Sequence, residues 1–330
     1  MPLKIVECIP NFSEARRPEV VDQIAAAIQS VAGVGVLDRH SDLDHNRTVL
    51  TFVGEPAAVE EAAYAAIAKA AQLIDLEQHE GQHPRIGATD VVPFVPISGV
   101  TMVECVEMAR RLGKRVADEL AIPVYFYEEA ALRPDRRNLE DIRRGEYEGL
   151  KLAIQQDPSR APDLGPARLG SAGATVIGAR EALIAYNIYL NTSDVGIAEK
   201  IARRVRNSSG GFRYVKAMGV LVGGLAQVSM NLTNFRRSPM AQITEMVRRE
   251  AARYGAGIHH SEIVGLVPNQ ALVNAARWYL QLDGFENEQL LDSRLFAWQG
   301  EQMSAAKTEQ SDFLEQVAEG TPSPGGGSAA

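Results

Sequence analysis

The sequence predicts an α+β fold made of two ferredoxin-like (split βαβ) layers within one chain of 330 residues. Apolar segments with strand and helix periodicity follow one another in the order β-α-β-β-α-β, and this order occurs twice. The composition, with 45% apolar and 23% charged residues, is that of a globular chain long enough for two cores.

The first half of the chain contains the first β-α-β-β-α-β pattern, with a turn predicted at residues 10–13. Its helices are predicted to begin at Pro18 and Pro56, since proline suits the first helical turn. The strands are predicted at residues 3–9, 34–37, 47–53 and 91–97, and a helix at 102–120 and a strand at 124–127 extend the pattern. Residues 133–168 are charged and rich in proline, which indicates a connection with a short helix near 143–155.

The second half repeats this order without an evident repeat of the residues. The predicted elements are a strand at 182–190, a helix at 195–205, a hairpin of 215–222 and 225–233, a helix from Pro239 to Gly255 with Ile243, Met246, Val247 and Tyr254 on one side, and a strand at 262–267. In the second hairpin strand apolar and polar residues alternate, so one face is predicted to pack against helices. We expect the polar faces of the two layers to form a cleft or tunnel for substrate.

The domain organisation that follows has three parts. Residues 1–180 form an N-terminal subdomain that includes the connecting segment 133–180, residues 181–300 form a C-terminal subdomain, and residues 301–330 are a polar tail.

Composition also bounds the partners and the compartment. The net charge of −8, without a basic stripe, argues against nucleic acid. No signal peptide and no apolar run of membrane-spanning length is evident, so we expect a cytoplasmic protein that does not bind membranes. Cys8 and Cys105 lie in apolar segments and are expected to be buried and reduced.

The stretch of residues 79–90 gathers histidine, arginine and aspartate between a predicted helix and a predicted strand. Residues 79–83 have the form H-E-x-x-H, which binds zinc when it lies on a helix. Gly81 and Pro84 are incompatible with that helix, so we predict no metal. A catalytic or ligand-binding loop is the preferred interpretation, with an ordinary exposed loop as the alternative.

Four histidines lie in this half of the chain close to Asp38, Asp42, Asp44 and Asp90. Histidine suits proton transfer near neutral pH, but hydrophilic loops also accumulate it, so a role for His40, His45 and His79 stays open. His83 is better placed because Pro84 restricts its backbone. The pair His259-His260 is predicted to be structural.

Several motifs together resemble glutamate formimidoyltransferase, the formiminotransferase part of formiminotransferase-cyclodeaminase. They run along most of the chain and are Val6-Glu7-Cys8-Ile9-Pro10-Asn11-Phe12-Ser13-Glu14, Asn46-Arg47-Thr48-Val49, His83-Pro84-Arg85-Ile86-Gly87-Ala88-Thr89-Asp90-Val91, Gly99-Val100-Thr101-Met102 and Asp163-Leu164-Gly165-Pro166. The resemblance implies transfer of a formimidoyl group from N-formimidoyl-L-glutamate to tetrahydrofolate, with His83 as the catalytic acid and base.

The chemistry of that reaction suggests further residues. A cationic amidine is best stabilised by a carboxylate, for which Asp90 is the first candidate and Asp38 the second. A capping aspartate is the alternative for Asp90. Arg47 and Arg85 are expected to bind substrate carboxylates, with Asn46 orienting them, unless they form ordinary ion pairs.

The resemblance also implies a folate-binding segment between the two units, with an ordinary flexible linker as the alternative. It comprises Gly165, Pro166, Ala167, Arg168, Leu169, Gly170, Ser171, Ala172 and Gly173. The segment is about one residue shorter than that of the eukaryotic enzymes and lacks their tryptophan.

The resemblance further implies a homodimer, with the apolar side of the helix at 102–120 as an interface or, alternatively, packed internally. Residues 313–315 and 323–328 resemble the start of a cyclodeaminase domain. The alternative functions are formyl transfer between glutamate and 5-formyltetrahydrofolate on the same site, and a non-catalytic folate-binding module.

Overall fold

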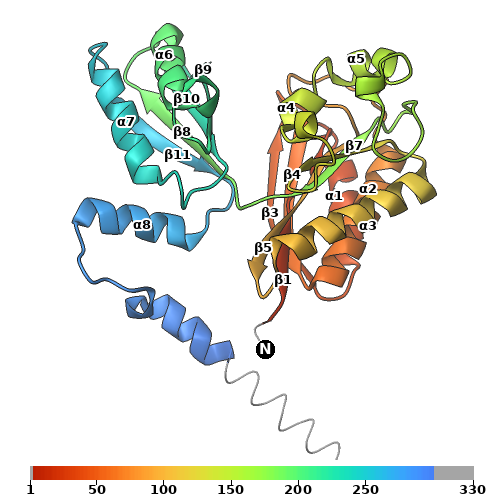
Figure 1. Cartoon of the computed structure of the whole chain (residues 1–330), viewed down its shortest axis with the longest axis horizontal. Helices are drawn as coiled ribbons and strands as arrows, with labels where there is room; N and C mark the ends of the chain where they lie inside the picture. Colours follow the sequence, from red (N-terminus) through yellow and green to blue (C-terminus); the bar gives the residue numbers. More distant parts are fainter. Residues whose placement is uncertain (1–2, 301–330) are drawn as a thin grey trace, which may run out of the picture. The chain divides into compact units, whose positions relative to one another are not determined.

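The computed structural model describes residues 3–300 of a chain that divides into two units, residues 1–271 and 272–330. The first unit contains two sheets, as the α+β prediction requires (Figure 1). The seven-stranded sheet consists of β1 (Ile5–Cys8), β2 (Asn11–Phe12), β3 (Val34–Asp42), β4 (Arg47–Gly54), β5 (Thr89–Ser98), β6 (Val124–Glu128) and β7 (Thr175–Ala179). The four-stranded sheet consists of β8 (Ile184–Leu190), β9 (Val215–Val222), β10 (Leu225–Leu232) and β11 (Ile258–Val264).

The helices of the first unit agree closely with the predicted ones. They are α1 (Pro18–Gln29), α2 (Pro56–Leu73), α3 (Met102–Leu120), α4 (Leu139–Ile142), α5 (Glu146–Ala153), α6 (Val195–Val205) and α7 (Met240–Ala252). Pro18 and Pro56 occupy the first turns of α1 and α2, as predicted. α5 matches the short helix that was expected near residues 143–155, and α4 is an additional short helix just before it.

The seven-stranded sheet is antiparallel at one side and parallel at the other. β4 pairs antiparallel with β3 and β1, and β5 pairs antiparallel with β1. β7 lies between β5 and β6 and is parallel to both. The sequence analysis missed β7, because its five residues follow a glycine-rich stretch inside the segment that was predicted to be a connection.

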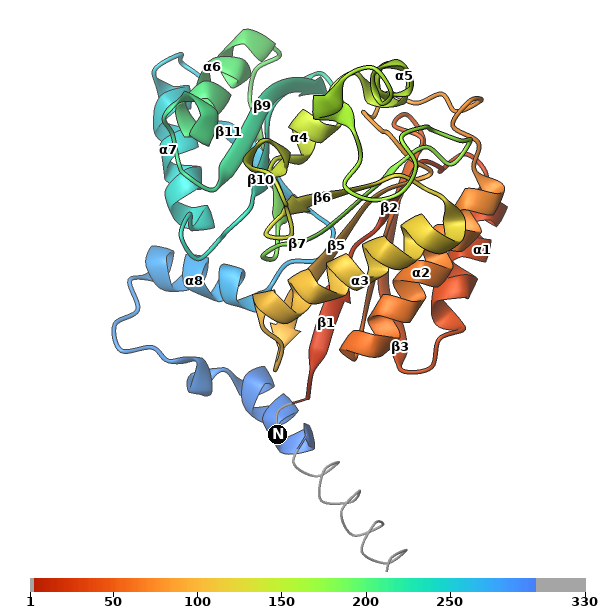
Figure 2. The same ribbon diagram turned by 45° about the vertical axis from the view of Figure 1, so that its right-hand side comes forward.

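Two layers of helix cover this sheet. α1, α2 and α3 lie side by side on one face and bury Phe52, Phe94 and Phe126 (Figure 2). α4 and α5 contribute Ile142 and Leu150 to a smaller core with other residues of β5, β6 and β7. Through this second layer the connecting segment packs against the start of β5.

The predicted turn at residues 10–13 is wrong, because Asn11–Phe12 forms β2. Pro10 lacks an N–H, but its carbonyl accepts a hydrogen bond from Leu50 N at 3.1 Å, so the pairing with β4 resumes beyond it. β3 is also longer than predicted and includes polar residues 39–42, which suit an exposed edge strand.

The four-stranded sheet has the order β11-β8-β10-β9, with every pair antiparallel. α6 and the hairpin of β9 and β10 match their predicted positions. β11 begins four residues earlier than predicted, so His259 and His260 lie on a strand. On α7, Ile243 and Val247 are buried as expected, whereas Met246 is 37% exposed; Tyr254, which lies two residues beyond the end of α7, is exposed to the same extent.

The two faces of β10 differ as its alternation predicted. Its apolar residues Ala226, Val228, Met230 and Leu232 belong to the core under α6 and α7. On the opposite face Tyr189 and Asn187 of β8 each donate a hydrogen bond to Glu262 of β11 at 3.2 Å.

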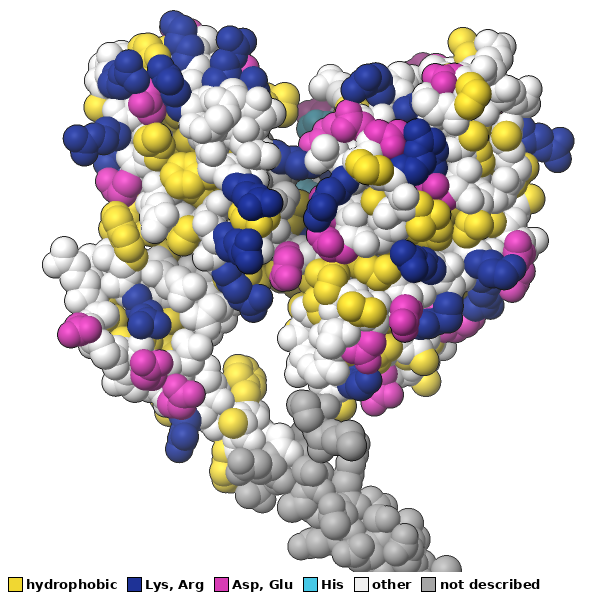
Figure 3. Space-filling model, viewed as in Figure 1, with side chains coloured by type: hydrophobic (Ala, Val, Ile, Leu, Met, Phe, Trp, Pro, Cys, Tyr) yellow, Lys and Arg dark blue, Asp and Glu magenta, His cyan; other side chains and the backbone are white. Residues whose placement is uncertain are grey.

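α3 packs its apolar side internally, which is one of the two alternatives for this helix. Cys105, Met108, Leu112 and Val116 are buried in the main core. The outer side of α3 is charged: Arg111 and Arg115 pair with Glu60 and Glu61 of α2, and Figure 3 shows basic and acidic side chains intermingled over this region. The exposed surface of α3 is therefore mainly polar.

The second unit is described up to residue 300. α8 (Asn269–Leu280) begins at the end of the first unit and continues into the second. The predicted polar tail at residues 301–330 lies outside the described residues. Within residues 3–300 no helix combines the length and apolar character needed to cross a membrane. Cys8 and Cys105 are buried and unpaired, as expected.

Candidate functional site

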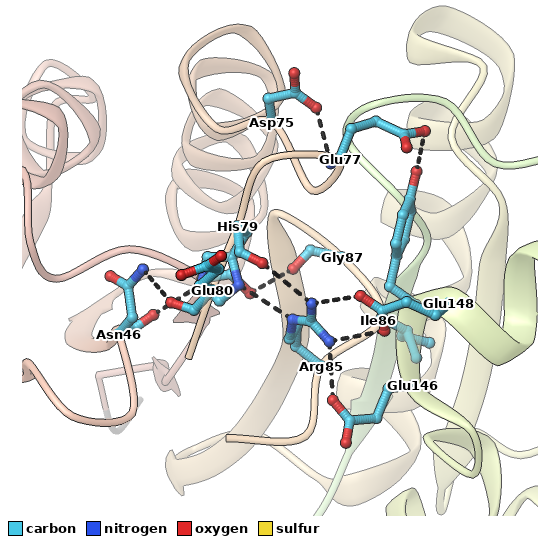
Figure 4. Close-up of polar contacts among 12 residues, drawn as sticks. Asn46, Asp75, Glu77, His79, Glu80, Arg85, Ile86, Gly87, Glu146 and Glu148 are labelled. Atoms are coloured by element: carbon cyan, nitrogen blue, oxygen red, sulfur yellow. Dashed lines mark hydrogen bonds and ion pairs between the residues drawn. The ribbon is translucent and has the colours of Figure 1, made fainter. Parts of the chain in front are cut away.

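Residues 74–88 form a loop between α2 and β5, and residues 79–83 are not helical, as Gly81 and Pro84 predict. The loop lies against the turn between β3 and β4. A Cβ atom on Gly81 would lie 2.4 Å from the carbonyl oxygen of His45, so only glycine permits this approach. Figure 4 shows this loop around Arg85.

The other end of the loop is fixed by a second close approach. A Cβ atom on Gly87 would lie 1.9 Å from the carbonyl oxygen of Ala174. Ala88 N donates to Ala172 O at 2.9 Å, and Ser13 Oγ donates to Gly87 O at 2.8 Å. The loop is therefore held between β2 and the segment that precedes β7.

A narrow pocket of about 10 Å³, room for roughly one water molecule, opens beside this loop. It is lined by Asn11, Phe12, Ser13, His45, Asn46, Arg47, His79, His83, Arg85 and Asp90. Complete small-molecule sites usually measure about 300–1,000 Å³, so this pocket is far smaller than a whole substrate. A neighbouring hollow of about 360 Å³ shares Asn46 and His79 with it.

His83 lies in the pocket as an uncharged imidazole. Burial and, after it, the charges of Arg47, Arg143 and His45 lower the pKa of His83 to about 2. The sequence analysis expected a histidine near its working pKa. The pKa of His83 is lower than expected because the ring is partly buried and two guanidinium groups lie near it.

Arg47 faces this pocket from the start of β4, as predicted. Its Nε donates to Asn11 Oδ1 at 2.7 Å, and its Nη2 also donates to that oxygen. Burial and the nearby Arg143 lower the pKa of Arg47 to about 10. No carboxylate hydrogen-bonds to this guanidinium among the described residues, so it is suited to bind an anionic substrate.

Asp90 lies at the base of the pocket and is buried. Its Oδ1 accepts a hydrogen bond from Ile86 N at 2.8 Å, and its Oδ2 forms an ion pair with Arg143, the residue after α4. Asp90 braces a turn, as the alternative of a capping aspartate predicts, and it also lines the pocket. Arg143 Nε is buried and has no hydrogen-bond partner within the described part of the chain.

Arg85 does not have the free guanidinium that carboxylate binding would require. Its side chain donates to Glu146 Oε2 at 2.8 Å and to Glu148 Oε1 at 2.7 Å, both on α5, and to His79 Nδ1 at 3.1 Å (Figure 4). Arg85 therefore fits the alternative of ordinary ion pairs better. In these pairs the Arg85 side chain is buried, whereas the Glu146 and Glu148 side chains are exposed. No local pattern indicates these partners, which lie more than 60 residues away.

His79 and Asn46 connect the loop to its surroundings. The hydrogen bond from Arg85 makes His79 Nδ1 an acceptor, so Nε2 carries the proton that faces Asn46 O at 3.1 Å. Asn46 Nδ2 donates to Glu80 O at 2.9 Å, and its Oδ1 accepts from Ala15 N at 2.9 Å. Both side chains hold the loop in place, and Asn46 does not orient an arginine as was expected.

His45 stands at the pocket next to His83, with their ring centroids 5.9 Å apart and nearly perpendicular. Its Nδ1 lies 2.7 Å from Asp42 Oδ2, and its backbone N–H donates to Asp42 Oδ1. Burial opposes the change, but these hydrogen bonds lower the pKa of Asp42. Of the three histidines left open, His45 is thus the one that lines the pocket and also contacts a carboxylate, that of Asp42.

Asp38 and the 165–173 segment do not line the pocket. Asp38 is half-buried at a bulge of β3. The segment runs beside the His83 loop rather than as a free linker: Ser171 O accepts from Leu76 N at 2.8 Å, and Gly170 O accepts from Gly173 N at 3.0 Å. Its side chains from Gly165 to Ser171 are exposed or half-buried.

Asn11, Phe12 and Ser13 line the pocket but were not predicted as site residues, and neither was Arg143, which pairs with Asp90 and lies near His83. The first three lie in a motif that was used only for the resemblance, and their assignment to a turn hid their pairing with β4 and β5. Arg143 is one of several arginines in a charged segment, where no pattern distinguishes it. No group of three or more metal-binding side chains occurs among residues 3–300.

Family models and known proteins match this chain over most of its length. The N-terminal subdomain model of the formiminotransferase domain matches residues 5–180, and the formiminotransferase domain model matches residues 185–293. Glutamate formimidoyltransferase of Thermoplasma acidophilum is 50% identical, covering 89% of this chain and 98% of the relative. The enzyme of that name from Streptococcus pyogenes serotype M1 is 44% identical, covering 88% and 99%. Formimidoyltransferase-cyclodeaminase of Mus musculus is 40% identical, covering 99% of this chain and 66% of the relative.

Proposed function

Because the chain belongs to the formiminotransferase family, we propose that it transfers the formimidoyl group of N-formimidoyl-L-glutamate to tetrahydrofolate in the His83 pocket. The products are 5-formimidoyltetrahydrofolate and L-glutamate. The chain is accordingly a one-carbon transferase of histidine degradation. The observation that carries the site assignment is an uncharged imidazole that shares the pocket with Arg47 and lies near the charge of Arg143, which offers a proton acceptor and a preference for anions.

The reaction moves protons in a defined order. N5 of tetrahydrofolate attacks the amidine carbon, the new C–N bond forms, and the N5 proton passes to His83 Nδ1 or Nε2. The tetrahedral intermediate then collapses as its bond to the glutamate nitrogen breaks and that nitrogen takes up a proton. Because His83 is uncharged before substrate binds, its basic form is fully available for the first step.

Substrate binding would also change the strength of His83 as a base. A pKa of about 2 makes an imidazole a weak acceptor, and the arginine charges are a main cause after burial. The carboxylates of formimidoyl-glutamate bring negative charge to Arg47 and Arg143. We infer that the bound donor offsets these charges and raises the pKa of His83 toward neutrality, so that the base is activated when the donor is in place.

Asp90 is proposed to hold charge rather than to move protons. The amidine carbon carries positive charge, which a buried carboxylate stabilises. Its ion pair with Arg143 fixes the orientation of the carboxylate, and its bond from Ile86 N fixes the turn after His83. Asp38, which lies outside the pocket lining, is less suited to this role.

The folate needs more room than the pocket gives. We propose that the pterin reaches the pocket along the neighbouring segment Gly165, Pro166, Ala167, Arg168, Leu169, Gly170, Ser171, Ala172 and Gly173, whose backbone is hydrogen-bonded to the His83 loop.

The finer points of the architecture are proposals as well. We assign both sheets to the ferredoxin-like, split βαβ class, because each contains the element order β-α-β-β-α-β. A substrate tunnel lined by their polar faces, a homodimer, a cytoplasmic location and a cyclodeaminase domain or partner complete the proposal. The unpaired, buried cysteines suit a reducing compartment.

The first test compares the wild type with His83→Ala and with His40→Ala, a control on the exposed edge strand β3. Purified protein is mixed with tetrahydrofolate and N-formimidoyl-L-glutamate, and release of glutamate and formation of 5-formimidoyltetrahydrofolate are both followed. We expect turnover by the wild type and His40→Ala, and a loss of at least about 100-fold in His83→Ala with folate binding retained. Folate binding without turnover by the wild type would instead favour a binding module, and turnover only with a formyl donor would favour formyl transfer.

A further inference from the structure

The proposed reaction contains two proton transfers, and the pocket contains two histidines with different surroundings. His83 is the inner one, and burial and two arginines favour its uncharged form. His45 is the outer one, with 46% of its side chain exposed and Asp42 beside it. Enzymes commonly divide acid and base roles between two groups whose environments favour opposite protonation states.

We propose that His45 is a second catalytic residue, the general acid that protonates the departing glutamate nitrogen, and that Asp42 positions it. This inference rests on the proposed function. The contact of its Nδ1 with the Asp42 carboxylate at 2.7 Å fixes the tautomer and the ring orientation. Nε2 is then the nitrogen that can donate to substrate, and Asp42 supplies the negative charge that stabilises the imidazolium.

The geometry suits a division of labour between the two rings. Their centroids are 5.9 Å apart, so a tetrahedral carbon bound alongside both rings can have its attacking nitrogen near one ring and its leaving nitrogen near the other. In the forward direction the N5 proton passes to His83 and a proton of His45 passes to glutamate. Solvent at the exposed His45 then restores its proton, while His83 releases the one it accepted.

Several charged groups lie at or near the pocket around His45. They are Asp42 on the same turn, Arg47 from β4, His79, His83 and Arg85 from the loop, Asp90 from β5, and Arg143, which pairs with Asp90. Asp42 is the carboxylate in direct contact with the ring. A conservative change at Asp42 should therefore affect His45 without altering the inner histidine directly.

The first test measures kcat and its pH dependence in His45→Gln and Asp42→Asn, with His40→Gln as the matched control. We expect kcat to fall about 100-fold in His45→Gln and about 10-fold in Asp42→Asn, with little change in the KM of the donor. The alkaline limb of the pH profile, which reports the acid, should disappear in His45→Gln and move to lower pH in Asp42→Asn. Wild-type kcat in His45→Gln would overturn the proposal.

A second test separates acid catalysis from a positioning role. N-formimidoyl-4-aminobenzoate releases an amine far less basic than glutamate, so its departure needs little protonation. The deficit of His45→Gln should shrink to a few-fold with this donor, whereas that of His83→Ala should persist, because attack still releases the N5 proton. Equal deficits of His45→Gln with both donors would show that His45 acts by position alone and would overturn the acid role.

A third variant guards against misfolding and keeps the two proposals distinct. Added imidazole should restore part of the activity of His45→Ala, because this side chain reaches solvent. If neither wild type nor His40→Gln transfers a formimidoyl group, the proposed function itself fails. If both do and His45→Gln does too, only the role of His45 fails.

Discussion

The two sheets of the first unit connect their second helix to the strand that follows it in different ways. In the seven-stranded sheet residues 74–88 join α2 to β5, and this loop carries His79, His83 and Arg85. In the four-stranded sheet residues 253–257 join α7 to β11, and His259 and His260 lie on the strand itself. The same element order thus supports a reactive loop in one sheet and a tight connection in the other.

The difference shows that a long loop becomes a site only when other segments hold it. The 74–88 loop is fixed by Asn46, by the close approach of Gly87 to Ala174, and by the partners of Arg85 on α5. The short connection has Gly255 in a left-handed conformation with φ of 68°, and no atom lies within 4 Å of the place of its missing Cβ. Gly87 is thus required by the close approach of another segment, whereas Gly255 is required by the backbone angle of its turn.

Alanine substitution at these two glycines should separate the two roles and give the largest change in stability. A Cβ on Gly87 would lie 1.9 Å from the backbone oxygen of Ala174, so Gly87→Ala forces the loop away from the segment before β7. We expect a loss of at least about 3 kcal/mol in the free energy of unfolding. Gly255→Ala only strains a positive φ and should cost about 1 kcal/mol. Urea denaturation measures both, and equal losses would contradict the distinction.

Local patterns were enough to predict most of the elements. The apolar stripe of α1, with Val20, Val21, Ile24 and Ile28, is buried as its spacing indicates, since helical periodicity depends on nearby residues alone. β7 was missed because its five residues include Gly178 and follow Gly173, and such a short run resembles a loop until β5 and β6 are seen on either side. The strand exists through pairing with distant segments.

The site followed the same rule. His83, Asp90 and Arg47 were found from a local cluster of reactive residue types, and they share the pocket. Arg85 was assigned to substrate because its partners Glu146 and Glu148 lie on a distant helix. Asp38 is close to the cluster in sequence but outside the pocket lining, because β3 pairs it with Thr51 at a bulge. Residue type predicted the chemistry, and long-range packing decided which residues are free to perform it.

The role of Arg85 can be decided by changing its partner as well as itself. If Arg85 positions the loop, Arg85→Gln and Glu148→Gln should both lower kcat about 10-fold with a nearly constant KM for the donor, since both break the contact with α5. If Arg85 binds a substrate carboxylate, Arg85→Gln should raise that KM and Glu148→Gln should lower it. Steady-state kinetics distinguish the two patterns. Glu129→Gln, which breaks an exposed pair with Arg137, is the control and should resemble the wild type.

The smallest effect concerns the stability of the two histidine regions in acid. Burial and neighbouring arginines lower the pKa of His83 from 6.5 to about 2. Between these values the unfolded chain binds a proton that the folded chain does not, so stability should rise with pH and fall as the pH drops below about 6.5. His83 is partly exposed, so we expect a contribution of about 1 kcal/mol or less between pH 6.5 and 5.

Replacing the histidine should remove that part of the acid sensitivity. Urea denaturation of His83→Gln at pH 7.5, 6.5, 5.5 and 5 should give a flatter dependence of unfolding free energy on pH than the wild type. His260→Gln, at an exposed position on β11, is the matched control from the other sheet and should keep the wild-type slope. Parallel curves for the wild type and His83→Gln would mean that the folded protein binds this proton as readily as the unfolded chain. The pocket would then not hold His83 in its uncharged form, and its contrast with the histidines of β11 would disappear.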